Sequence, residues 1–260
     1  MTFFSFLCMS KIFEIISMDL VIDQGNTVCK LAFFKDENEI AELRTCSELS
    51  VPYLLDLLKE HDIKACILSS VKILNGEIIE CLRSNIPQFI HLDHQTPLPI
   101  VNAYKTPKTL GLDRLAAAVG AWSIQPGKPL LVIDMGTAIT YDFVSEDGIY
   151  MGGNIAPGLK MRLKALNKFT DKLPLVEPLK DFDTLGTDTQ TAIRAGVMQG
   201  IVYEVEGCFQ DLQQKHSKLF AFLTGGDLFY FDGKLKNSIF ACKNLVLIGL
   251  NRILHNNVHS

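Results

Sequence analysis

The sequence predicts an α/β protein made of two similar halves, each a mixed sheet flanked by helices. A six-residue motif that occurs twice supports the duplication: residues 20–25 read LVIDQG, and residues 131–136 read LVIDMG. In both copies an apolar run ends at an aspartate and a glycine, and a second apolar run follows the turn. Strand-like and helix-like patterns also alternate through both halves, which is typical of the α/β class.

The first half is expected to span residues 18–125 and to open with a strand, a polar turn and a returning strand. Short apolar runs bounded by turn residues place these strands at 19–23 and 29–34. Periodicity then predicts a helix at 51–60, a strand at 65–71, a helix at 76–84, a strand at 88–92 and, after a Pro-rich loop, a helix at 111–124. The linker QPGKP at 125–129 ends this half.

The second half, residues 126–260, restarts with strands at 130–134, 139–144 and 149–152. Glycines and Pro157 predict a sharp bend between 152 and 158. Helices are expected at about 158–168, 187–215 and 245–254, with a strand at 219–223. The long helix could bind a partner, but its pattern favours core packing. The TGGD segment at 224–227 is expected to open a helix.

Composition restricts the class of protein. The chain has 260 residues, is 48% hydrophobic and carries a net charge of −4, which fits a globular protein and argues against broad binding to nucleic acid. Its seven cysteines form no CxxC pair, so we expect reduced, mostly buried thiols in a cytoplasmic protein without a zinc site. His91 and His94 beside Asp93 could ligate a metal, but a solvated loop is the preferred interpretation.

Residues 1–17 are apolar but lack the features of a signal peptide. The stretch is also too short and too interrupted to span a membrane, so no membrane partner is expected. We interpret it as an upstream extension before a natural start at Met18. A poorly ordered amphipathic arm is the alternative.

The first turn has the residue types of a phosphate site. Gly25, Asn26 and Thr27 could cradle phosphates through backbone and side-chain donors, and Lys30 could neutralise them. Asp23 could hold Mg²⁺ directly or through water. An ordinary hairpin would also use Gly-Asn, but a bare hairpin has no need to repeat the acid and the glycine.

The second turn, DMGTAIT at 134–140, repeats this pattern. Asp134 could ligate a cation, and Thr137 could donate to a phosphate oxygen. Gly225 and Gly226 follow a predicted strand and could let backbone approach a phosphate or a flat ligand, although a structural turn is equally compatible. Two opposed turns predict halves that face one another across a phosphate-bearing ligand.

The GLDR segment at 111–114 opens a predicted helix. Its residues alone favour a helix cap with an exposed ion pair between Asp113 and Arg114. Asp113 could instead act as a general base on a substrate hydroxyl, or orient it. The glycines at 153 and 158 have P-loop spacing, but Leu159 stands where the P-loop lysine is required, so a P-loop is excluded.

Six motifs together resemble the type III pantothenate kinases, within the ATPase superfamily of actin, sugar kinases and heat-shock chaperones. In chain order they are DQGNTVCK, GLDR, DMGTAIT, GGNIAPGL, DTQTAIRAG and TGGD. The resemblance runs from Met18 to the C-terminus. It implies duplicated actin-like (ribonuclease H-like) halves and ATP-dependent phosphorylation of pantothenate to 4′-phosphopantothenate, the first step of coenzyme A biosynthesis.

The resemblance also implies roles for individual residues. The ATP phosphates would be bound by Asp23, Gly25, Asn26, Thr27 and Lys30, and ATP would also contact Thr137. Asp113 would be the catalytic acid group, and Asp134 would bind a monovalent cation, K⁺ or NH₄⁺, in addition to Mg²⁺. Pantothenate would be bound by Tyr104, Gly111, Leu112, Asp113, Arg114 and Thr189. The family is typically a homodimer whose substrate pocket is completed at the interface.

One departure from the family pattern is Asp188, where the family often has asparagine, which puts a charge near an anionic substrate. Two other functions stay open. One is a related kinase acting on a sugar or another small alcohol, and the other is a non-catalytic regulatory protein. Retention of Asp23, Lys30, Asp113 and Asp134 argues against the second, since a pure binder does not need all four.

Overall fold

The structure, a computed structural model, describes residues 17–36, 39–236 and 239–258. The predicted extension at 1–17 therefore lies outside the described residues except for Ser17. The first sheet has the strand order β3-β2-β1-β4-β5. Its strands are β1 (Met18–Gln24), β2 (Cys29–Phe34), β3 (Ile40–Cys46), β4 (Ile63–Ser70) and β5 (Gln88–His91).

The second sheet repeats this topology. Its order is β11-β10-β7-β8-β9-β6. Its strands are β6 (Val101–Asn102), β7 (Leu130–Met135), β8 (Ala138–Val144), β9 (Ile149–Pro157), β10 (Phe220–Thr224) and β11 (Ile239–Ala241). The strands β9-β8-β7-β10-β11 match β3-β2-β1-β4-β5 in order and in direction, because in each set the first two pairs are antiparallel and the last two are parallel. β6 is an additional edge strand, parallel to β9. The predicted duplication is thus present in the fold.

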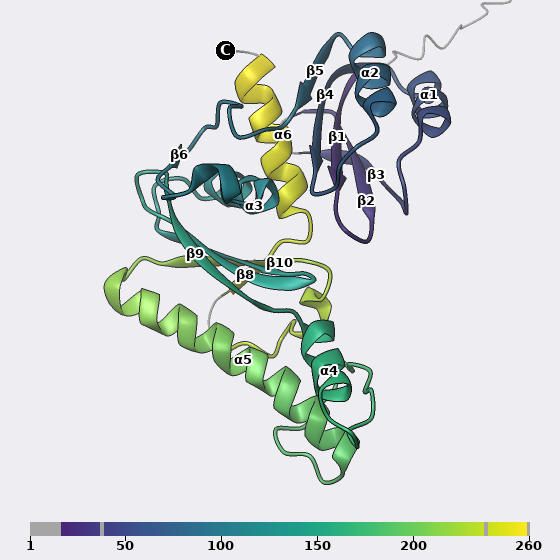
Figure 1. The fold of residues 1–260 in the computed structure, drawn as a ribbon. Helices are drawn as coiled ribbons and strands as arrows, with labels where there is room; N and C mark the ends of the chain where they lie inside the picture. The colour runs from purple at the N-terminus through teal and green to yellow at the C-terminus, as the bar shows by residue number, and fades with distance from the viewer. Residues whose placement is uncertain (1–16, 37–38, 237–238, 259–260) are drawn as a thin grey trace, which may run out of the picture.

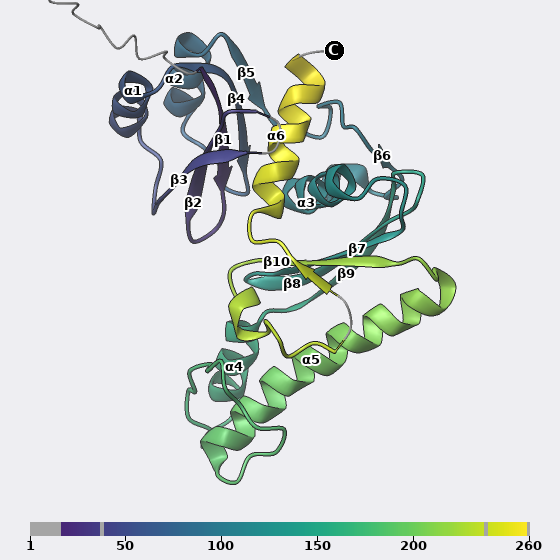
Figure 2. The same ribbon diagram turned by 180° about the vertical axis from the view of Figure 1, so that it is seen from behind.

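Helices separate and cover the two sheets (Figures 1 and 2). They are α1 (Val51–Glu60), α2 (Gly76–Asn85), α3 (Leu112–Ile124), α4 (Leu159–Lys168), α5 (Thr189–Lys215) and α6 (Leu245–Val258), with short 3₁₀ turns η1 (Pro107–Thr109) and η2 (Leu228–Tyr230). α1 and α2 pack on the outer face of the first sheet, and α4 and α5 on the outer face of the second. α3 and α6 lie between the sheets and share one core with both.

α3 and α6 cross at very short range. A methyl group built on Gly120 of α3 would overlap the carbonyl oxygen of Leu245, and one built on Gly249 of α6 would overlap the carbonyl oxygen of Ala116. α6 also packs on β1 and β4, whereas α3 packs on β7 and β8. Each half therefore contacts a helix that the other half contributes. The boundary predicted at residues 125–126 stays a prediction.

Most predicted elements are present, but several features differ from the prediction. The strand expected at 149–152 is longer, because β9 continues to Pro157, and the chain passes into α4 only at Gly158; within β9, Gly152, with φ of 123°, marks an irregularity in the pairing with β8. β3 was missed because its half-buried face carries Glu42 and Arg44 rather than apolar residues, so the strand lacks apolar alternation. The TGGD segment leads into the short turn η2 and not into an α-helix.

The long helix α5 buries one side in the second core, as its pattern predicted. Asp188 is its N-cap and accepts a hydrogen bond from the Thr191 N–H (2.9 Å), while the Thr191 hydroxyl completes a capping box. Aspartate and asparagine are equally good N-caps. The departure at residue 188 therefore preserves the start of the helix.

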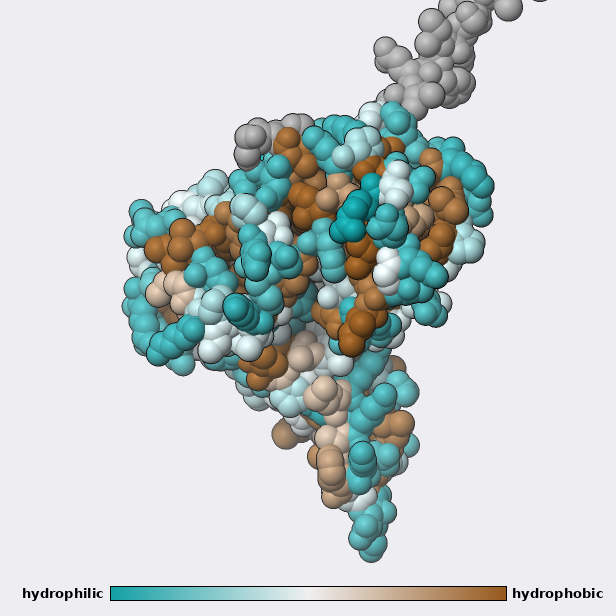
Figure 3. All heavy atoms as spheres, turned by 45° about the horizontal axis from the view of Figure 1, so that its top comes forward, coloured by the Kyte–Doolittle hydropathy of each residue, from teal (hydrophilic) through white to brown (hydrophobic). Residues whose placement is uncertain are grey.

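Large exposed apolar side chains gather where α4, the loop after it and the start of α5 meet. Phe169 and Leu185 are 79% and 82% exposed, and Met161, Leu175 and Leu179 are also exposed. This region is the tapering lower end of the molecule, where brown and tan residues interrupt the polar surface (Figure 3). No helix in residues 17–36, 39–236 and 239–258 has the length and apolar character to cross a membrane.

The helix crossing gives a stability prediction. Gly249→Ala is expected to lower the free energy of unfolding by about 2 kcal/mol, because the added methyl group meets backbone that cannot move aside. Gly200→Ala in α5 is the control, since its methyl group would meet no atom within 4 Å. The control should be neutral or stabilising by up to about 1 kcal/mol. Equal midpoints of the two variants in urea unfolding would contradict the inferred crossing.

Candidate active site

Two polar turns of similar geometry end the central hairpins of the two sheets. The Gly25 N–H donates to the Val28 carbonyl (3.1 Å), and the Gly136 N–H donates to the Ala138 carbonyl (3.1 Å). Asn26, Thr27 and Thr137 are exposed at the tips. Asp23 and Lys30 are direct cross-strand neighbours at the base of the first turn. Asp134 has the equivalent place at the base of the second.

The second turn is held by two glycine contacts. Gly225 has φ of 98°, and a methyl group there would meet the Met135 carbonyl and the Asp134 carboxylate. Gly158 precedes α4, donates its N–H to the Thr137 carbonyl (3.2 Å) and leaves no room for a side chain. Both positions require glycine because backbone approaches backbone directly. The TGGD segment therefore packs directly against the backbone of the second turn.

α3 begins at Gly111 and brings Asp113 into the same region. The Asp113 carboxylate accepts a hydrogen bond from the Arg114 N–H (2.8 Å) and lies over Gly111, where a methyl group would clash with it. An acidic residue in the first turn is favoured by the helix dipole. Asp113 is half-buried and thus remains accessible to a ligand.

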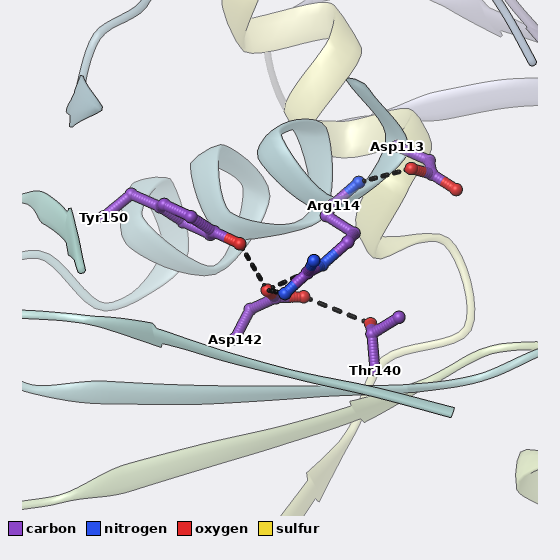
Figure 4. A network of polar contacts seen from close by, with 5 residues as sticks. All are labelled: Asp113, Arg114, Thr140, Asp142 and Tyr150. Atoms are coloured by element: carbon purple, nitrogen blue, oxygen red, sulfur yellow. Dashed lines mark hydrogen bonds and ion pairs between the residues drawn. The ribbon is translucent and has the colours of Figure 1, made fainter. Parts of the chain in front are cut away.

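Arg114 does not form the exposed ion pair with Asp113 that the residues alone favoured. It is buried, and its guanidinium donates from Nε (2.9 Å) and Nη2 (2.6 Å) to one carboxylate oxygen of Asp142 on β8. Figure 4 shows Arg114 reaching from the start of α3 to Asp142, with Tyr150 and Thr140 on either side. The exposed ion-pair interpretation is therefore wrong, because the side chain pairs across the core with a strand 28 residues later.

Tyr104 joins this group. Its ring lies 6.2 Å from that of Tyr150, edge to face, and its backbone N–H donates to the Asn102 side chain (3.0 Å). The fold therefore brings Tyr104 close to Tyr150, which shares the Asp142 carboxylate with Arg114. Asp142 and Tyr150 were not predicted, since a polar residue in a strand gives no sign of its partner.

Three carboxylates lie close enough to affect one another. Burial raises the pKa of Asp23 to about 6; Lys30 opposes this rise and Asp113 adds to it. Burial likewise raises the pKa of Asp134 to about 6, again with Asp113 adding to the rise and Lys30 opposing it. The strand ends and the start of α3 thus form one acidic cluster around a single lysine.

A pocket of about 800 Å³ adjoins this cluster. Among the residues predicted to contact ATP, it is lined by Thr27, Lys30, Thr137 and Gly226. Lys160, Lys164 and Lys168 of α4 also line it, and Lys160 pairs with Asp227 (3.8 Å). The three lysines were missed, although their spacing of four residues indicates a basic helix face. The pocket can therefore accept an anionic ligand.

Thr189 is the one predicted site residue that the fold leaves apart from this region. It is exposed in the first turn of α5, and α5 begins beside α4 at the tapering end of the molecule, whereas α3 lies between the sheets (Figures 1 and 2). A single chain therefore does not bring Thr189 to Asp113.

The other candidate metal ligands have a structural explanation. Asp93 accepts hydrogen bonds from the backbone N–H groups of Gln95 and Thr96 (2.8 Å each), which makes a local turn. Within the described ranges, no group of three or more histidine, cysteine or acidic side chains is arranged to hold a metal. Asp93 and His94 are exposed in this turn, whereas His91 is the last residue of β5. Six described cysteines are free thiols, and Cys8 lies outside the described residues.

The duplicated sheets and opposed acidic turns define an actin-like α/β fold of the kind found in sugar kinases. A glucokinase from an Antarctic psychrotroph superposes with a TM-score of 0.53 at 13% identity, covering 92% of this chain and 99% of that one. A protein from Campylobacter jejuni described as a Baf family transcriptional activator gives a TM-score of 0.58 at 23% identity, covering 93% and 100%. At these identities the similarity establishes the fold alone.

Sequence comparison places the chain within one family of this fold. The sequence model for type III pantothenate kinase matches residues 19–211. A type III pantothenate kinase of Phocaeicola vulgatus is 50% identical over 92% of this chain and 99% of its own length. One of Bacteroides fragilis is 49% identical over 92% and 98%. The chain belongs to the type III pantothenate kinase family.

The raised pKa of Asp134 predicts a stability effect with a defined sign. When the pKa of a carboxyl is higher in the folded protein than in the unfolded chain, the free energy of unfolding falls as the pH rises from about 4 through about 6. Asp134→Asn should therefore raise the free energy of unfolding at pH 8 by about 2 kcal/mol in K⁺-free buffer and leave it unchanged near pH 4.

The control for this prediction is Asp147→Asn, which changes an exposed aspartate in the turn before β9. It should change the free energy of unfolding by less than about 0.5 kcal/mol at either pH. Urea unfolding at both pH values gives the comparison. No gain for Asp134→Asn at pH 8 would show that Asp134 is not disfavoured by burial.

Proposed function

We propose that the protein phosphorylates pantothenate to 4′-phosphopantothenate with ATP as the phosphoryl donor. The observation that carries this proposal is the position of Asp113, at the start of α3 and within electrostatic reach of Asp23 and Asp134 at the two opposed turns. Membership of the type III pantothenate kinase family supplies the substrate.

ATP is proposed to bind in the pocket between the two turns. Thr27 and Thr137 would donate to phosphate oxygens, and Lys30 would neutralise part of their charge. Gly25 and Asn26 lie on the first turn, and Gly225 and Gly226 on the loop that supports the second. The α4 lysines Lys160 and Lys164 would extend the positive side of the pocket. Positive groups on two sides fit a long polyphosphate.

The residues present fit two cations whose remaining ligands come from ATP and water. Asp134 is half-buried, and no ion pair to it is found within the described part of the chain. Asp134 would hold the monovalent cation, K⁺ or NH₄⁺, and Asp23 would hold Mg²⁺, directly or through water. Mg²⁺ commonly uses one or two carboxylates plus substrate phosphates. Bound cations offset the repulsion between the acidic cluster and the triphosphate.

Phosphoryl transfer requires the pantothenate hydroxyl to be held in line with the γ-phosphate. Asp113 would align the primary hydroxyl of pantothenate with the γ-phosphorus and accept its proton as the new O–P bond forms. The bond between the γ-phosphorus and the bridging oxygen breaks, and ADP leaves. Because this transition state is loose, placement and charge neutralisation contribute most of the acceleration. Tyr104 and residues 111–114 would surround the pantothenate.

The active unit is proposed to be a homodimer in the cytoplasm. Thr189 of one chain would complete the pantothenate pocket of the other, since Thr189 lies away from Asp113 within its own chain. The exposed apolar residues near the start of α5, Phe169 and Leu185 among them, fit a surface that a second copy covers. The free thiols in the described residues fit a reducing compartment.

Transfer of phosphate from ATP to pantothenate by the purified protein tests the function, with Mg²⁺ and with or without K⁺. Product that depends on K⁺ or NH₄⁺ is expected. Product that forms equally well without K⁺ or NH₄⁺ would support the kinase activity but contradict the proposal that Asp134 binds a monovalent cation. No product from a folded dimer would favour another small alcohol as substrate or a regulatory function, and a screen of sugars and alcohols with ATP would separate these.

Asp113→Asn is expected to lower kcat at least about a hundredfold while the KM for ATP changes little, because the proton acceptor is lost and the phosphate contacts remain. Steady-state kinetics with both substrates give the result. Asp147→Asn is the matched control and should retain full activity. Unchanged turnover of Asp113→Asn would remove Asp113 from the mechanism.

Mixed dimers test the shared pocket. Asp113→Asn and Thr189→Ala homodimers should each be impaired, because every site lacks one group. A mixed dimer of the two variants has one site with Asp113 and Thr189 both intact, so activity should return after subunit exchange. Activity that stays at the average of the two variants would contradict a pocket built across the interface.

A further inference from the structure

A buried polar network links the start of α3 to the middle of the second sheet. Asp142 has no exposed surface, and one of its oxygens accepts from Arg114 Nε and Nη2 and from the Tyr150 hydroxyl (2.5 Å). Its other oxygen accepts from the Thr140 hydroxyl (3.1 Å). Burial and the neighbouring carboxylate raise the pKa of Tyr150, so the phenol keeps its proton and donates. The carboxylate is therefore satisfied on both oxygens (Figure 4).

This network uses only one edge of the Arg114 guanidinium. Nε and Nη2 are engaged by Asp142, whereas Nη1 makes no hydrogen bond to the described residues. The planar guanidinium has its five N–H groups in a fixed arrangement, so fixing one edge fixes the other. The free Nη1 group can then meet an anionic group, such as the carboxylate of pantothenate, without any loss of the contact to Asp142.

Arg114 is also the neighbour of Asp113. The Arg114 N–H donates to the Asp113 carboxylate, and both residues belong to the first turn of α3. A side chain clamped in the core at residue 114 therefore restricts how the first turn of α3, and with it Asp113, can move. A buried ion pair gives little net stability compared with apolar packing, so its main effect here is on geometry.

We propose that Asp142 is a positioning residue for the substrate pocket: it holds the Arg114 guanidinium so that its free edge recognises the carboxylate of pantothenate. The inference rests on the proposed function, because pantothenate is the ligand of Arg114. Asp142 contacts neither substrate and acts through Arg114 alone.

Asp142→Asn tests this directly. It removes the charge and leaves a single amide oxygen for Arg114, so the KM for pantothenate should rise about tenfold or more while the KM for ATP stays within about twofold. A merely structural role would lower stability without separating the two KM values. Equal changes in both KM values, or none, would overturn the proposal.

The matched control is Glu204→Gln. Glu204 accepts from the Tyr141 hydroxyl (2.7 Å) and from Arg162 Nη2 (2.7 Å), which is a similar network on the other face of β8. Tyr141 belongs to the outer core with α4 and α5, whereas Asp142 faces α3. Glu204→Gln should therefore affect stability but leave the KM for pantothenate unchanged.

A second comparison tests whether Asp142 acts through Arg114, even if the Asp142→Asn single variant does not fold. Arg114→Gln alone leaves Asp142 buried without its cation, whereas the double variant Arg114→Gln/Asp142→Asn pairs two neutral amides. Since Asp142 acts through Arg114, the double variant should bind pantothenate as well as Arg114→Gln or better. A further rise in the KM for pantothenate would overturn the proposal. No transfer to pantothenate by the unchanged protein would instead refute the proposed function.

Discussion

The close crossing of α3 and α6 is the constraint on which the site depends. Gly120 and Gly249 remove both side chains at the contact, so two helices fit as one layer between the sheets. That layer fixes the separation of the sheets and hence of the two polar turns. It also fixes where α3 begins, and α3 carries Asp113 and Arg114 on its first turn. Packing far from the ligand pocket thus sets the distances within it.

The acidic cluster of Asp23, Asp113 and Asp134 lowers the stability of the folded protein at neutral pH. Asp23 and Asp134 are disfavoured by burial and by the nearby Asp113, and Lys30 alone offsets them in part. Such carboxylates are poor elements of a core but suitable ligands for cations that accompany a triphosphate. The opposite solution is used for Asp142, whose charge is buried completely and hydrogen-bonded on both oxygens.

The sequence predicted the duplication and the turns because both are local patterns: an apolar run, an acid, a glycine and a second apolar run. It did not predict the pairing of Arg114 with Asp142, since a link across 28 residues leaves no periodic signal. β3 was missed for a related reason, because the centre of its half-buried face carries Glu42 and Arg44, and Arg44 pairs with Glu60 of α1. Local chemistry is thus readable from sequence, whereas long-range polar pairing requires the fold.

Strand β8 contacts the helices on both faces of the second sheet. Alternation along the strand sends Asp142 toward α3 and Tyr141 toward α5, so neighbouring residues anchor the two helix layers on either side of the second sheet. Tyr141 binds Glu204 of α5, and Glu204 binds Arg162 of α4. The helix that begins at Thr189 is therefore fixed to the helix whose lysines line the proposed ATP pocket. One strand thus anchors the start of α3 through Asp142 and joins the two outer helices through Tyr141.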